Sequence, residues 1–95
     1  MDSLKSESYV VFMSYDPEYE QLRNDRTERG AYELDLYLSR KHDEILATTL
    51  EPGSYMKVSS WVIVDAFEVE ITKDQANVLR SAKGVRIVEK NEEVF

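Results

Sequence analysis

The side chains that most often carry out chemistry are sparse in this sequence. His42 is the only histidine, there is no cysteine, and the three glycines are scattered. Thiol catalysis, disulfides and thiolate metal sites are therefore excluded within this chain, and no glycine cluster forms a phosphate cradle. A metal or catalytic role for His42 needs further groups of fitting geometry. The alternative is a packed histidine on an apolar helix face. We expect no catalytic residue, no metal and no cofactor.

Carboxylates are the most abundant functional groups. The sequence has 19 acidic and 12 basic residues, which gives a net charge of −7. A diffusely acidic surface repels phosphate backbones, so we expect no nucleic-acid partner. The same acidity also serves solubility. No stretch approaches the roughly 20 apolar residues that a membrane span requires, so we expect no membrane partner.

The first eight residues are polar, and we expect them to be flexible. They contain no apolar run of the kind found in secretory leaders. If Met1 is the native start, the expected compartment is the cytosol. If the native N-terminus is longer, an extracellular location is equally compatible with the sequence.

The hydrophobic pattern predicts the elements that position the remaining side chains. Helical spacing of apolar residues predicts a helix over 31–50, and a Thr72/Gln75 capping box begins a second helix that Gly84 follows as a left-handed cap. Residues 14–30 are polar and are expected to form a long loop. The expected strands cover residues 9–13, 54–64, 67–71 and 85–88.

The resulting order β-α-β-β-α-β predicts an α+β, ferredoxin-like sandwich. One four-stranded antiparallel sheet carries both helices on one face, with strands 9–13 and 67–71 at its centre. Residues 9–13 (Tyr-Val-Val-Phe-Met) are apolar on both faces of their strand. The sheet face without helices should therefore expose apolar side chains, which is typical of a partner surface.

Several short segments match a known sequence pattern in the same order along the chain: Tyr9–Met13, His42–Leu46, Ser60-Trp61, Ala66–Thr72, Ala76–Leu79 and Gly84–Val88. Together they are similar to the propeptide of plant subtilisin-like proteases. The chain thus resembles the peptidase inhibitor I9, or subtilisin propeptide-like, family, in its standalone plant form. On this resemblance, residues 1–8 are a flexible N-terminus, residues 9–89 are the inhibitor domain, and residues 90–95 are a C-terminal tail.

The resemblance implies a function and a set of binding residues. A standalone member acts in trans as an inhibitor of a subtilisin-like serine protease, with a secondary chaperone activity toward the protease fold, and is expected to be a monomer when free. The open sheet face packs on two surface helices of the protease, and a carboxylate caps their N-termini. Asp65 is the first candidate, followed by Glu68 and Glu70. The tail lies in the substrate groove like a cleaved product, through Glu92, Glu93, Val94 and Phe95.

Each of these assignments has a simpler alternative. Turn chemistry alone explains Asp65, and Glu68 and Glu70 fit a solvated strand face. Trp61 fits a core or sheet-edge position as well as a binding hot spot, and residues 94–95 fit a frayed end. The loop over 14–30 fits either a solvated or a regulatory segment. At the level of function, the alternatives are a non-inhibitory protein–protein interaction module on the same fold, and a small-molecule regulatory domain or enzyme.

Overall fold

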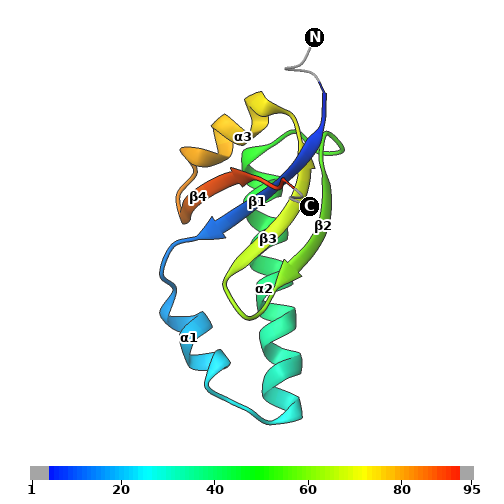
Figure 1. Ribbon diagram of the computed structural model, residues 1–95. Coiled ribbons are helices and arrows are strands. Elements are labelled where there is room, and N and C mark those ends of the chain that lie inside the picture. The colour runs from blue at the N-terminus through cyan, green and yellow to red at the C-terminus, as the bar shows by residue number, and fades with distance from the viewer. Residues whose placement is uncertain (1–4, 93–95) are drawn as a thin grey trace.

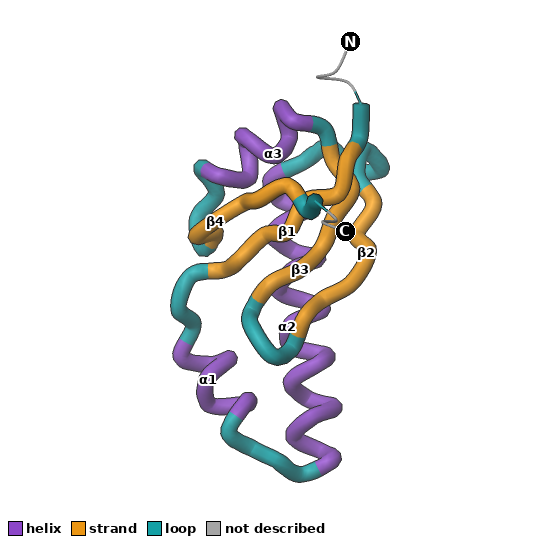
Figure 2. Tube along the Cα trace, in the orientation of Figure 1, coloured by secondary structure: helices purple, strands orange, loops and turns teal. Residues whose placement is uncertain are grey.

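The computed structural model describes residues 5–92 and shows an α+β fold. Its elements are β1 (Glu7–Met13), α1 (Pro17–Arg23), α2 (Glu28–Thr49), β2 (Met56–Trp61), β3 (Ala66–Ile71), α3 (Lys73–Arg80) and β4 (Val85–Lys90). The strands form one antiparallel sheet in the order β2-β3-β1-β4, which Figures 1 and 2 show from its open side. The predicted sandwich is confirmed, including the central positions of β1 and β3.

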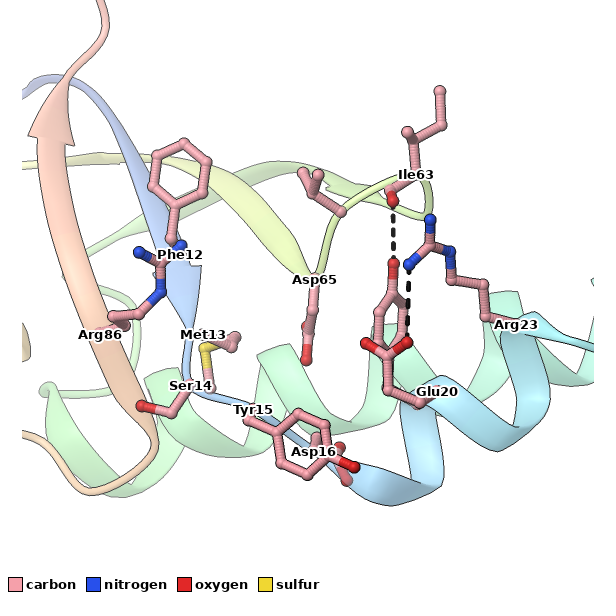
Figure 3. A pocket seen from close by; sticks show the side chains of 12 residues that line it. Phe12, Met13, Ser14, Tyr15, Asp16, Glu20, Arg23, Ile63, Asp65 and Arg86 are labelled. Carbon is pink, nitrogen blue, oxygen red and sulfur yellow. Dashed lines mark hydrogen bonds and ion pairs between the residues drawn. The ribbon is translucent and has the colours of Figure 1, made fainter.

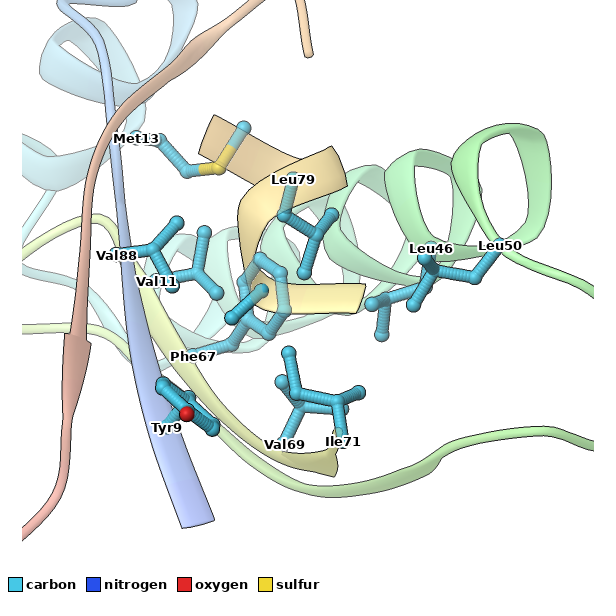
Figure 4. Packing of buried hydrophobic residues seen from close by; sticks show 11 residues of the cluster. Tyr9, Val11, Met13, Leu46, Leu50, Phe67, Val69, Ile71, Leu79 and Val88 are labelled. Atoms are coloured by element: carbon cyan, nitrogen blue, oxygen red, sulfur yellow. The ribbon is translucent and has the colours of Figure 1, made fainter. Parts of the chain in front are cut away.

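The core lies between the sheet and the two helices α2 and α3. Alternate residues of β3, Phe67, Val69 and Ile71, are fully buried there against Leu46 of α2 and Leu79 of α3, as Figure 4 shows. Burial of side chains of this size contributes about 1.5–3 kcal/mol each, so the core fixes which face of every strand turns outward.

The prediction of a long loop over residues 14–30 is wrong. It contains the helix α1, and α2 begins at Glu28 rather than at residue 31. The Asp16 side chain accepts a hydrogen bond from the Glu18 backbone N–H (3.0 Å), and Pro17 starts the helix. α1 then buries Tyr19 in a second small core with Leu34 and Leu38 of α2.

Gly30 does not end the loop, because it lies in the first turn of α2. The Thr27 side chain caps this helix by accepting from the Gly30 backbone N–H (3.0 Å). A Cβ atom on Gly30 would clash with the side chain and backbone of Asp25, so the close approach of the preceding turn requires glycine here.

The predicted start of the second helix, α3, is confirmed. The helix ends earlier than predicted, and the second strand, β2, is shorter than predicted. Thr72 and Gln75 form both hydrogen bonds of the capping box of α3. The helix ends at Arg80, so Gly84 takes its positive φ of 90° in the turn before β4 rather than as the helix cap. β2 covers only Met56–Trp61, with a register shift between Lys57 and Ser59, and residues 62–65 form the hairpin turn.

Candidate functional site

The sheet face opposite α2 and α3 has two chemically different ends. The register aligns Phe12 with Ala66 and with Ile87, and Trp61 with Ala66, which gives an apolar end beside the β2–β3 hairpin. At the other end, Glu70 of β3 lies opposite Ser8 of β1. We call this surface the open face, and its two parts the apolar end and the acidic end.

Aromatic and aliphatic side chains form the apolar end. The rings of Phe12 and Trp61 meet edge to face, with centroids 6.4 Å apart, and the Arg86 guanidinium lies 5.9 Å from the Phe12 centroid. In Figure 3 the Phe12 ring points away from the helix layer. Ile87 and Trp61 are each 36% exposed. Trp61 lies on the edge strand β2, which agrees with the sheet-edge position considered for it in the sequence analysis.

The exposed apolar surface continues onto the β2–β3 hairpin turn. Ile63 is 82% exposed, and its neighbours Val62 and Val64 are also exposed. Turns more often carry Gly, Asn, Asp or Pro at such positions, so three consecutive aliphatic residues are unusual. The buried Tyr19 hydroxyl of α1 lies 2.8 Å from the Val62 carbonyl and 3.0 Å from the Ile63 carbonyl, and donates to them. Tyr19 of α1 therefore fixes the position of the aliphatic turn.

Removing this hydroxyl tests how far it orders the turn. We expect Tyr19→Phe to lower the free energy of unfolding by about 1–2 kcal/mol, because two turn carbonyls lose their donor while the ring still packs. Amide exchange of residues 62–65 should accelerate more than exchange in β3. Equal exchange in the variant and the wild type would show that the turn is ordered without Tyr19.

Asp65 lies at the end of the same turn, but its carboxylate points inward. Its side chain is only 8% exposed. Oδ1 lies 2.7 Å from His42 Nε2, and Oδ2 accepts from Lys41, which also donates to Asp16 (2.8 Å). The Asp65 carboxylate thus ties the hairpin to α2. Its predicted role as a helix cap for a protease would require it to leave these partners, which favours Glu68 and Glu70 for that role.

The same network brings a serine, a histidine and an aspartate together. His42 Nδ1 lies 2.8 Å from Ser60 Oγ, while Nε2 faces Asp65. These are the distances of a catalytic triad. His42 is, however, 0% exposed, and Ser60 faces α2 from within the sheet-to-helix interface. Ser60 itself is half-buried, so the three residues form a hydrogen-bond network between the sheet and α2, and the complete burial of His42 confirms the packed-histidine alternative.

Burial lowers the pKa of His42, and this effect outweighs the hydrogen bond that its Nε2–H donates to Asp65, which favours the protonated ring. The unfolded chain therefore takes up a proton near the ordinary pKa of 6.5, whereas the folded chain does so only at lower pH. The neutral His42 ring therefore makes its full contribution to the free energy of unfolding above pH 6.5, and this contribution is lost as the pH falls below 6.5.

We therefore expect the melting temperature of the wild-type chain to decrease as the pH is lowered from 7 to 5. Burial raises the pKa of Asp16, but hydrogen bonds from Lys41 and Tyr37 lower it further, so this carboxylate affects stability only at more acidic pH. A His42→Gln variant should show a smaller fall between pH 7 and pH 5, as measured by thermal denaturation. An identical pH dependence in both proteins would contradict the assignment to His42.

A groove of about 450 Å³ opens at the hairpin end of the molecule, between α1, the turn and the start of β4. Figure 3 shows that Arg23, Arg86 and Tyr15 stand around it, while Asp65 points from the hairpin toward the helix layer. This groove borders the apolar end, so a partner covering Phe12 and Ile63 would also cover its mouth.

The predicted binding residues divide into four groups. Glu68 and Glu70 lie on the open face, Asp65 lies inside, and Glu92 is exposed just beyond β4. Glu93, Val94 and Phe95 lie outside the described residues. The sequence analysis placed Phe12 in a strand that is apolar on both faces, but it did not identify Ser8, Asn91 or the aliphatic turn as parts of the site. The apolar composition of residues 62–64 was the available signal for the turn.

Two further findings concern residues 5–92. No group of three or more His, Cys, Asp and Glu side chains in this range is arranged to hold a metal ion. None of the helices in this range combines the length and the apolar character needed to cross a membrane.

Comparison with known proteins connects part of the chain to plant proteases. Subtilisin-like protease SBT2.5 of Arabidopsis thaliana is 43% identical over 56 residues, and subtilisin-like protease SBT2.4 of the same plant is 46% identical over 54 residues. These stretches make up 58% and 56% of this chain but only 7% and 6% of the two proteases. No family model and no solved structure matches. The chain is thus homologous in part to a short segment of plant subtilisin-like proteases.

Proposed function

We propose that this protein is a trans-acting inhibitor of subtilisin-like serine proteases, built on a propeptide-like domain of the inhibitor I9 type. One observation carries the proposal: a chain partly homologous to a short segment of such proteases has a sheet face that its own helices leave open, with an apolar end and an acidic end. Such a face is suited to a protein partner rather than to a small substrate.

The apolar end supplies the contact area of this proposed interface. Phe12, Trp61 and Ile87 present aromatic and aliphatic surface from three different strands. Aromatic side chains at the centre of an interface commonly dominate its binding energy. The edge-to-face packing of Phe12 on Trp61 orders both rings before binding, which reduces the entropy lost on association.

The acidic end supplies charge for the N-termini of helices on the protease. Exposed N–H groups and the helix dipole make such termini partly positive. Ser8 and Asn91 both donate to Oε2 of Glu68, so Oε1 is the oxygen that would cap a helix of the partner. Glu70 lies on the same face and is exposed. In this proposal Glu68 and Glu70 perform the capping, while Asp65 supports the hairpin.

The tail performs the inhibition itself. β4 ends beside Ser8, so the chain leaves the sheet at the acidic end. Residues Glu92 to Phe95 would then extend along the substrate groove and pair with its strands, with Val94 and Phe95 in the non-primed subsites like a cleaved product. We also propose that the chain is not an enzyme, since His42 is fully buried and the Asp65 side chain is engaged by His42 and Lys41 within the fold.

Substitution on the β4 side of the apolar end tests the proposed interface. We expect Ile87→Asp to weaken inhibition of a plant subtilisin-like protease on the order of 100-fold, because it places a charge in a desolvated contact. Val78→Asp is the matched control, since Val78 is 49% exposed on α3. Thermal denaturation confirms that both variants fold. Equal potency of the two variants would contradict binding through the open face.

A further inference from the structure

Three side chains form a hydrogen-bonded line across the acidic end, one from each of three neighbouring strands or their extensions. Ser8 of β1 donates from Oγ to Oε2 of Glu68 in β3 (2.6 Å). Asn91, directly after β4, donates from Nδ2 to the same Oε2 (3.2 Å) and approaches Ser8 Oγ (3.4 Å). A single carboxylate oxygen on the open face thus binds the first residue after β4.

The backbone places Asn91 for this contact. Its N–H donates to the Ser8 carbonyl (2.9 Å), which continues the β1–β4 pairing one residue beyond Lys90. Side chains of directly paired residues share a face of the sheet, so Asn91 and Ser8 both face the side on which Glu68 lies. Lys90, one residue earlier, faces the opposite side and pairs with Glu7 (2.6 Å). The end of β4 is therefore held from both faces.

We propose that Ser8 and Asn91 are positioning residues of the inhibitor: through Glu68 they fix the point and direction at which the tail leaves the sheet. This inference rests on the proposed function. A tail that starts from a fixed point loses less freedom when it enters the substrate groove.

Substitutions of Asn91 separate this role from a general effect on stability. We expect Asn91→Ala to weaken inhibition about 10-fold, with an unchanged melting temperature, and to speed amide exchange of residues 91 and 92. Asn91→Asp should weaken inhibition further, because its carboxylate faces Glu68. Asn77→Ala is the matched control, since Asn77 is an exposed asparagine on α3 that hydrogen-bonds to Arg80 (2.5 Å).

A reciprocal exchange of donor and acceptor provides the most specific readout. In the double variant Asn91→Asp with Glu68→Gln, the introduced amide can donate to the introduced carboxylate. Slow amide exchange of residues 91 and 92 should return, whereas inhibition stays weaker than in the wild type because the Glu68 charge is gone. Asn91→Asp alone should show fast exchange.

The outcomes distinguish this inference from the proposed function. If the wild type inhibits and Asn91→Ala is equally potent, the positioning role is overturned while the proposed function stands. If the wild type does not inhibit, the proposed function fails and the positioning role in inhibition fails with it. Exchange at residues 91 and 92 that is unaffected by Asn91→Ala overturns the anchor itself, whatever the inhibition assay shows.

Discussion

Deletion of residues 92–95 should weaken inhibition of a plant subtilisin-like protease by at least about 100-fold. In the proposed mechanism the open face supplies binding, but only the tail occupies the substrate groove and pairs with it. Without Glu92, Glu93, Val94 and Phe95, the chain is expected to bind beside the active site and leave it open to small peptide substrates. The measurement is the inhibition constant of the full and shortened chains, with a short chromogenic peptide as substrate.

A binding measurement on the same two proteins serves as the control. The shortened chain keeps β4 and Asn91, so its melting temperature should equal that of the full chain, and it should still bind the protease with reduced affinity. Unchanged inhibition would show that the tail is not the inhibitory element, and would locate inhibition in the sheet face alone.

The second large effect concerns stability rather than inhibition. We expect Asp65→Ala to reduce the free energy of unfolding by about 3 kcal/mol, because it leaves Nε2 of buried His42 without a partner and removes one of two carboxylates from Lys41. For a domain of this size, about 3 kcal/mol corresponds to a fall of roughly 12–24 °C in melting temperature. Urea denaturation at pH 7 measures the loss.

Asp65→Asn separates hydrogen bonding from charge in this network. The amide oxygen can still accept from His42 Nε2, so the loss should be about half of that in Asp65→Ala. A loss below about 0.5 kcal/mol in Asp65→Ala would contradict the role of Asp65 as the tie between hairpin and helix. It would also return Asp65 to the candidates for contact with a protease.

The sheet was predictable from the sequence because its residues satisfy local and tertiary preferences together. Phe67, Val69 and Ile71 alternate with glutamates, so one register alone buries the apolar set. The capping box at Thr72 likewise fixes a helix start through two local hydrogen bonds. In both features the local pattern agrees with the tertiary structure, and both were predicted correctly.

The segment 14–30 was predicted wrongly because its helix depends on a tertiary contact. α1 has only seven residues, too few for stability by itself, and it is held by burial of Tyr19 against α2. The sequence Asp16-Pro17-Glu18 does match a helix start. That signal was outweighed by the polar composition of the segment.

The site was only partly predictable for a similar reason. Alternation placed Glu68 and Glu70 on the outer face, but no pattern shows that Asp65 turns inward to His42, a contact between residues 23 positions apart. Similarly, Asn91 meets Ser8 across 83 positions. Such contacts follow from strand order, and only the folded sheet brings them together.

Titration of a plant subtilisin-like protease with the full chain tests the central claim most directly. A concentration of active protease well above the inhibition constant makes the endpoint stoichiometric, and a bacterial subtilisin serves as a second target. The proposed function predicts that activity falls linearly to near zero at one inhibitor per active site, at nanomolar concentrations. Full activity in the presence of micromolar chain would contradict it, and would leave the open face as the docking surface of a non-inhibitory interaction module.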